Sequence, residues 1–114
     1  IYKDFTFEAA HKLPLVPDTH KCSKLHGHSF KVRISVENEL SNLGWVIDYA
    51  DIKSACEPVI DALDHSYLNE LPGLDNPTSE NIAVWLWNEI QPKLVILSEI
   101  EVKETCNTGC IYRG

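Results

Sequence analysis

The sequence of 114 residues lacks any apolar run close to the roughly 20 residues that a membrane-spanning helix needs, which argues against a membrane protein. It also lacks an excess of positive charge, because 17 acidic side chains outnumber 10 lysines and arginines and give a formal net charge of −7. Nucleic-acid binding requires clustered Lys and Arg, so we expect no nucleic-acid partner. An anionic small molecule remains compatible with this charge, since a local basic pocket can form on an acidic protein.

A signal peptide is not recognisable either, because the start, IYKDFTFEAAH, has no charged stretch followed by an apolar one. We therefore expect a cytoplasmic, reducing environment and free thiols on the four cysteines. Cys56 lies in a helical pattern and is expected in the core. Cys106 and Cys110, in TCNTGC, have the form of half a zinc site, but the sequence has no second cysteine pair of this kind.

Alternation of apolar and polar residues predicts the strands. The longer ones are expected at 1–13, 26–37 and 98–105, with another short one in CIYRG at the end. The segment ENELSNLG is interpreted as a hairpin turn that leads into a further short strand at WVID. No repeat or linker interrupts the chain, so we expect a single domain over residues 1–114.

Two helices are predicted between the strands. The first covers about 49–63, with Asp48 as its N-cap, and the second covers about 79–91, where Thr78 or Ser79 is most simply a cap. The second helix is apolar nearly all round, which indicates burial on more than one side, as another subunit would provide. The order of elements favours an α+β fold with helices on one face of an antiparallel sheet.

Four ionisable side chains fall on strand faces that otherwise look buried: His11, His26, His28 and Glu104. A buried polar group without a partner costs about 1–3 kcal/mol, so each needs one. Residues two apart in a strand point the same way, about 6.5–7 Å apart at Cα, so His26 and His28 can converge on one ion. With His11 as third ligand and an open fourth position, the pattern is typical of catalytic zinc; ordinary hydrogen-bonded core histidines are the alternative.

Functional and structural interpretations are both open for four residues: Cys22, Asp64, His65 and Glu104. Cys22 precedes the second strand, and a thiol near zinc or a basic group can act as nucleophile, base or fourth ligand; otherwise it is an ordinary loop cysteine. Asp64 and His65, in LDHSYLN, form a carboxylate–imidazole pair of the kind that orients a base, although adjacent pairs are common. The carboxylate of Glu104 can accept two hydrogen bonds from a guanine or pterin edge, unless its strand has already reached solvent.

These stretches together resemble the 6-pyruvoyltetrahydropterin synthase superfamily over nearly the whole length. The resemblance is carried by FTFEAAHKLP, KCSKLHGHSF, LDHSYLN, NPTSENIAVWLW and VKETCNTGCIYRG. It is nearest to the 6-carboxy-5,6,7,8-tetrahydropterin synthase branch of queuosine biosynthesis, because three residues separate Cys22 from His26 and the motif continues with Ser29 and Phe30. It implies the tunnelling fold (T-fold), a four-stranded antiparallel sheet with two helices on one face. It also implies a homo-oligomer, a dimer of trimers with active sites at subunit interfaces.

The resemblance further implies a zinc-dependent lyase acting on 7,8-dihydroneopterin 3′-triphosphate and releasing 6-carboxy-5,6,7,8-tetrahydropterin, acetaldehyde and triphosphate. The alternatives are a 6-pyruvoyltetrahydropterin synthase activity and a non-catalytic, zinc-stabilised binding module. Carried over by motif, the roles are as follows: His11, His26 and His28 bind zinc; Cys22 accepts a proton; Asp64 and His65 complete the relay; Glu104 anchors the pterin; and Thr78, Ser79 and Glu80 line its pocket. The triphosphate partner stays open among Lys12, Lys21, Lys24, Lys31 and Arg33.

Overall fold

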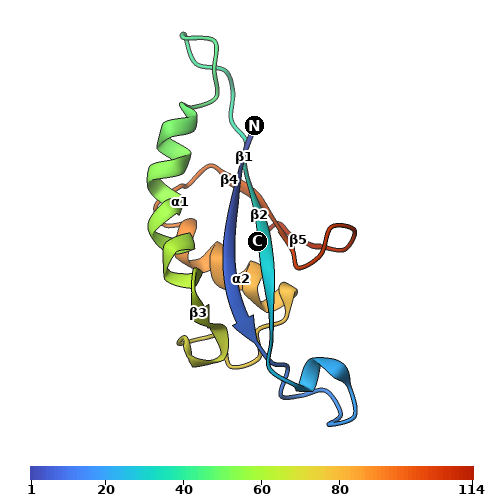
Figure 1. The fold of residues 1–114 in the computed structure, drawn as a ribbon. Coiled ribbons are helices and arrows are strands. Elements are labelled where there is room, and N and C mark those ends of the chain that lie inside the picture. The colour runs from blue at the N-terminus through green and yellow to red at the C-terminus, as the bar shows by residue number, and fades with distance from the viewer.

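The computed structural model describes all 114 residues as an elongated molecule of 56 × 24 × 21 Å (Figure 1). Its elements are, in chain order, β1 (Tyr2–His11), η1 (Lys21–Ser23), β2 (His26–Val36), α1 (Tyr49–Leu63), β3 (Ser66–Tyr67), η2 (Leu68–Glu70), α2 (Ser79–Ile90), β4 (Leu97–Lys103) and β5 (Cys110–Tyr112). Both predicted helices are present, and so is the short strand expected at the C-terminal end. Neither helix has the length and apolar character needed to cross a membrane.

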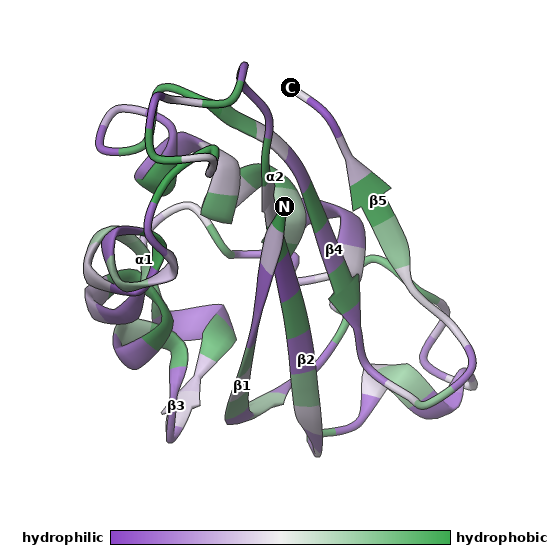
Figure 2. Cartoon of the chain, turned by 90° about the horizontal axis from the view of Figure 1, so that it is seen from above, coloured by the Kyte–Doolittle hydropathy of each residue, from purple (hydrophilic) through white to green (hydrophobic).

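The sheet has the strand order β3-β1-β2-β4-β5. Strands β1, β2, β4 and β5 pair with their neighbours in antiparallel fashion, which confirms the predicted four-stranded antiparallel sheet. A fifth strand was not expected: β3 pairs in parallel with β1 over two residues, Ala9 with Ser66 and Ala10 with Tyr67. Helices α1 and α2 lie together on one side of the sheet (Figure 2), so the α+β class is confirmed.

The prediction of a strand at WVID is wrong. Residues 45–48 belong to no strand, and a turn precedes them in which the Ser41 N–H donates to the Trp45 carbonyl at 2.8 Å. The turn uses Gly44 at φ 82°, a left-handed conformation that glycine adopts without strain. The physical reason is the sheet order: β2 already has β1 on one edge and β4 on the other, so no edge remains for a hairpin partner.

The core lies between the helices and the inner face of the sheet. Alternate residues of β2 supply its centre, since Phe30, Val32, Ile34 and Val36 are each at most 1% exposed. This is the period-two pattern expected from the sequence. Helix α2 is buried on several sides by its own chain, because Trp87 packs edge-on against Tyr112 of β5 in addition to the contacts of α2 with the sheet.

Candidate active site

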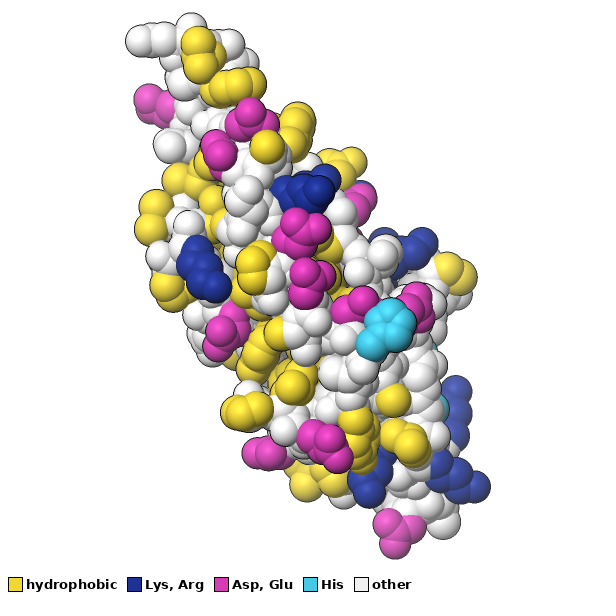
Figure 3. Space-filling view, turned by 60° about the vertical axis from the view of Figure 1, so that its left-hand side comes forward, with side chains coloured by type: hydrophobic (Ala, Val, Ile, Leu, Met, Phe, Trp, Pro, Cys, Tyr) yellow, Lys and Arg dark blue, Asp and Glu magenta, His cyan; other side chains and the backbone are white.

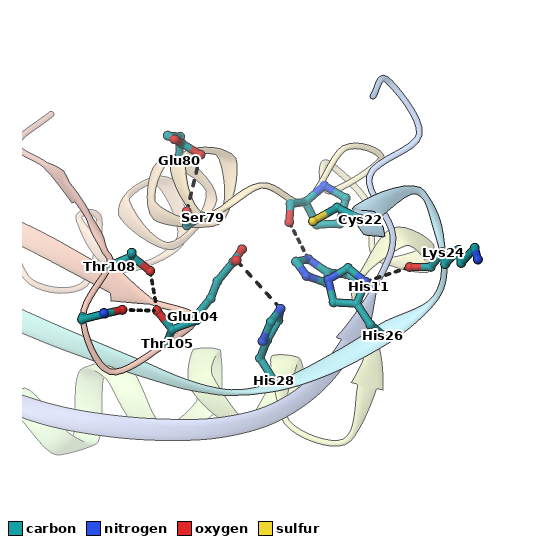
Figure 4. A network of polar contacts seen from close by, with 12 residues as sticks. His11, Cys22, Lys24, His26, His28, Ser79, Glu80, Glu104, Thr105 and Thr108 are labelled. Carbon is teal, nitrogen blue, oxygen red and sulfur yellow. Dashed lines mark hydrogen bonds and ion pairs between the residues drawn. The ribbon is translucent and has the colours of Figure 1, made fainter. Parts of the chain in front are cut away.

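The three histidines meet at the end of the β1–β2 pair. In the antiparallel register His11 lies directly opposite His26, and His28 is two residues further along β2 on the same face. The ring centroids are 4.5 Å apart for His11 and His26, 5.2 Å for His11 and His28, and 5.0 Å for His26 and His28. One nitrogen from each ring lies within 4.8 Å of the others, so the group could hold a metal ion (Figure 4).

The hydrogen bonds of this cluster leave ring nitrogens free to bind a metal ion. The His11 ring is only 1% exposed, and its Nδ1 lies 2.8 Å from the Pro77 carbonyl, to which it can only donate. Nε2 of His11 then carries the lone pair, and it is buried without any hydrogen-bond partner. Nδ1 of His26 likewise lies 2.7 Å from the Lys24 carbonyl. Burial lowers the pKa of His11, which favours the neutral imidazole that metal ligation requires.

A pocket of about 330 Å³ opens beside these rings. Its lining residues are Lys21, Cys22, His26, His28, Glu104 and Thr105. Glu104 follows the last residue of β4 and continues the inward parity of the buried Val102. Its Oε2 lies 3.8 Å from Nε2 of His28, and its side chain is 27% exposed, so the carboxylate faces the pocket while keeping contact with solvent (Figure 4). The pocket therefore combines candidate metal ligands, a thiol and a carboxylate.

Cys22 is placed by the turn η1. The Cys22 N–H donates to Nδ1 of His20 at 3.1 Å, and the Cys22 carbonyl accepts from the Leu13 N–H at 2.8 Å. The Ser23 hydroxyl adds bonds of 3.0 and 2.7 Å to the carbonyls of Asp18 and His20. His20 is exposed and helps to hold this turn. These bonds fix a partly buried thiol on the wall of the pocket.

Asp64 and His65 form the expected pair but do not line that pocket. Oδ2 of Asp64 is 2.9 Å from Nδ1 of His65, and Oδ1 accepts from the Glu8 N–H at 2.8 Å. The bond from the Glu8 N–H, followed by that from His65, lowers the pKa of Asp64. The His65 side chain is 81% exposed and lines another hollow of about 500 Å³ together with Glu8, Ser29 and His28, the last of which also lines the Cys22 pocket. Within one chain, then, the pair does not share a pocket with Cys22.

The start of α2 lies next to the cluster. Thr78 is the N-cap, with its hydroxyl accepting from the Asn81 N–H at 3.2 Å. Ser79 and Glu80 occupy the first turn, near Glu104 in Figure 4, but they contribute no wall to the 330 Å³ pocket. Their expected contact with a pterin therefore stays a prediction.

Some contacts of the site could not be found by inspecting side-chain patterns. The carbonyl groups of Pro77 and Lys24 orient two of the imidazoles, and a main-chain group leaves no signature in residue type. Thr105 lines the pocket because the chain turns just after β4, and no side-chain pattern indicated this position. The other two cysteines of interest, Cys106 and Cys110, take no part in the metal-compatible group, and the half-site interpretation gains no support.

The fold and this set of side chains define a T-fold protein of the pterin-synthase class. The sequence model of the family described as 6-pyruvoyl tetrahydropterin synthase matches residues 1–114, and the chain belongs to this family. A 6-carboxy-5,6,7,8-tetrahydropterin synthase of Synechocystis sp. is 42% identical, over 98% of this chain and 91% of that protein. A dihydroneopterin monophosphate aldolase of Pyrococcus furiosus is 37% identical, over 78% of this chain and 72% of that protein.

Solved structures agree on the fold. The Caenorhabditis elegans 6-pyruvoyl tetrahydropterin synthase superposes with a TM-score of 0.92, over 100% of this chain and 94% of that one, at 24% sequence identity. At this sequence identity, the structural similarity establishes the fold alone. The reaction has to be inferred from other observations. Family membership and the names of the relatives support an enzyme of the pterin-synthase kind, of lyase type.

Proposed function

We propose that this protein is a zinc-dependent carbon–carbon lyase. With one water consumed, it converts 7,8-dihydroneopterin 3′-triphosphate to 6-carboxy-5,6,7,8-tetrahydropterin, acetaldehyde and triphosphate, as a step of queuosine biosynthesis. The main observation behind the proposal is a single pocket lined by a thiol, a carboxylate and two histidines of the three-histidine cluster. The 42% identity to a relative named for the carboxypterin product supports this branch over the others.

His11, His26 and His28 would hold the zinc ion, with their outer hydrogen bonds to carbonyls fixing two of the rings. Bound zinc supplies Lewis acidity, which polarises side-chain oxygens of the substrate and makes the adjacent C–H bond more acidic. Because the pocket opens directly onto His26 and His28, a ligand can approach the cluster from that side. A closed structural zinc site would leave no such opening.

Glu104 and Cys22 would act on the substrate from two walls of the pocket. The Glu104 carboxylate accepts hydrogen bonds from the N–H groups of the pterin ring and so fixes its orientation. The Cys22 thiolate removes the proton from the side-chain carbon that the orientation brings near it. General-base assistance of this kind typically contributes 10²–10⁴-fold to a rate.

Asp64 and His65 would serve the site of a neighbouring subunit. The His65 ring is 81% exposed and lines a hollow other than the Cys22 pocket of its own chain. For His65 to relay protons, it therefore needs the Cys22 pocket of a second copy of the chain. This supports a homo-oligomer with active sites at subunit interfaces, for which we propose the dimer of trimers. Mixing inactive Cys22→Ala and His65→Ala proteins, followed by dissociation and reassembly, should restore part of the activity. No recovery in verified mixed oligomers would contradict the shared site.

Product analysis tests the proposed reaction. The zinc-loaded protein is incubated with 7,8-dihydroneopterin triphosphate, and the products are identified by mass spectrometry, with a Glu104→Ala protein as control. We expect carboxytetrahydropterin and acetaldehyde in equal amounts. A product that keeps its three-carbon side chain would instead show a 6-pyruvoyltetrahydropterin synthase. Unchanged substrate, with bound zinc and an intact oligomer, would favour the non-catalytic binding module.

A further inference from the structure

The loop between β1 and β2 concentrates positive charge on an acidic protein. Residues 12–25 contain three lysines, Lys12, Lys21 and Lys24, and one acidic residue, Asp18, so the loop carries a formal charge of +2 where the whole chain carries −7. Cationic side chains gather at the lower end of the molecule (Figure 3), the end at which Figure 1 places this loop. All three lysines are exposed, and none of them takes part in an ion pair.

Only one of these lysines reaches the candidate active site. Lys21 lines the 330 Å³ pocket beside Cys22 and is the sole cationic residue on its wall. The carbonyl oxygen of Lys24 is hydrogen-bonded to Nδ1 of His26, while the Lys24 side chain points away from the histidines in Figure 4. Lys12 lines none of the four hollows on the protein surface. Lys21 also begins η1, the turn whose hydrogen bonds place Cys22, so its backbone is held in place.

We infer that Lys21 is the residue that binds the triphosphate of the substrate and selects the phosphorylated pterin. The inference rests on the proposed function and extends it to a position that sequence motifs left open. The wall of this pocket combines an anionic group on Glu104, two histidines of the metal-compatible cluster, and Cys22 with its cationic chain neighbour Lys21. The substrate has groups that match all three: an N–H-rich ring edge, a hydroxylated side chain and a polyanionic end. The unpaired ammonium group of Lys21 is the complement that a triphosphate needs.

Binding measurements on zinc-loaded Cys22→Ala protein, which should not turn over, test this assignment. Two ligands are compared by calorimetry: 7,8-dihydroneopterin triphosphate and 7,8-dihydroneopterin without phosphate. Adding Lys21→Met should weaken the triphosphate about tenfold, the order of a charged hydrogen bond at a partly exposed site, and leave dihydroneopterin unchanged. Lys21→Arg should retain most of the preference, and Lys12→Met, which removes the same charge from the same loop, should change neither affinity.

The other outcomes overturn the inference in distinguishable ways. Equal affinity of the Lys21→Met protein and its parent for the triphosphate would exclude Lys21 as its partner. An equal loss with Lys12→Met would show a general effect of loop charge rather than a contact. If neither pterin binds to the zinc-loaded parent protein, the proposed function itself fails, and the role of Lys21 fails with it.

Discussion

At the scale of single residues, the most informative atom is Nε2 of His11. It is a buried nitrogen without a hydrogen-bond partner, next to two other imidazoles, and an arrangement of this kind costs free energy unless something binds there. The Pro77 carbonyl fixes the opposite nitrogen as the donor, so the free nitrogen carries a lone pair. A bound cation satisfies that lone pair. In an ordinary core histidine, the corresponding nitrogen would accept a hydrogen bond from another group of the protein.

The roles of Cys22 and His28 separate under mutation. Cys22 lines the pocket outside the three-histidine group, whereas His28 belongs to that group. We predict that Cys22→Ala keeps stoichiometric zinc but loses at least 10²-fold in turnover, the usual contribution of a general base. His28→Ala should lose both zinc and turnover. Metal analysis by atomic emission, combined with product assays, checks both variants, and near-normal activity in Cys22→Ala would rule out this base.

The stability contributed by Asp64 should depend on pH. Hydrogen bonds from the Glu8 N–H and His65 lower its pKa in the folded protein below the ordinary 3.8. A depressed carboxyl pKa stabilises the fold above the unfolded-state value, and that contribution disappears as pH falls through the folded-state value. The difference in urea midpoint between the native sequence and Asp64→Asn should therefore be constant from neutral pH down to about 4, and shrink below it.

Asp61→Asn provides the control for that experiment. Asp61 lies in the last turn of α1, just before Asp64, and is exposed, and its side chain is not needed for any of the hydrogen bonds around Asp64. Its substitution should leave the urea midpoint nearly the same throughout. A difference for Asp64→Asn that does not change with pH would show that the carboxylate charge is not what stabilises the pair.

At the scale of elements, the site depends on where strands and helices begin and end. His11 is the last residue of β1, His26 the first of β2, and Glu104 follows β4 directly. The cap of α2 adds a fourth boundary, because Pro77, directly before the cap residue, carries the carbonyl that holds His11. Side chains at such ends can converge on one point while the interiors of the same elements form the core.

Removing the cap of α2 should destabilise the protein. Thr78→Ala takes away the hydroxyl that accepts the Asn81 N–H, and we expect the free energy of unfolding to fall by about 1 kcal/mol. Thr78→Ser keeps a capping hydroxyl and should lose much less. Chemical denaturation of the three proteins, compared at equal zinc loading, measures both effects. Equal stability of all three would mean that the cap bond contributes little to this helix.

Much of the secondary structure could be predicted from the sequence, and the predictions that failed did so for physical reasons. Period-two alternation placed His26, His28 and Phe30 on one face, because parity along a strand is a local property. The strand expected at WVID failed because strand pairing depends on which edges are free, and β4, distant in sequence, already occupies that edge of β2. The separation of His65 from Cys22 was likewise not visible, since it depends on how β3 and α1 pack against β1.

At the scale of the whole molecule, the core and the site are largely separate. A cluster of 21 buried apolar residues fills the space between the sheet and the helices, and only His11 among the histidines is buried beside it. The fold therefore has a source of stability that does not depend on a metal, unlike small domains that fold only around zinc. This arrangement suits a protein in which the bound ion serves chemistry.

Stripping the metal should leave the fold intact. After treatment with a chelator, we expect an unchanged far-ultraviolet circular dichroism spectrum and a cooperative thermal transition, with the midpoint lowered because a ligand of the native state has been withdrawn. Adding zinc back should restore the original midpoint. Loss of the spectrum on chelation, recovered on adding zinc, would instead indicate a structural site and support the non-catalytic binding module.

The zinc environment itself offers the most direct test of the three-histidine site. X-ray absorption spectroscopy of the zinc-loaded protein should show three imidazole nitrogens at roughly 2.0–2.1 Å and one further light atom that changes when a pterin substrate is added. A sulfur scatterer at roughly 2.3 Å would place Cys22 on the metal and remove it as a free base. That result, or fewer than three imidazoles, would contradict a catalytic zinc ion held by His11, His26 and His28.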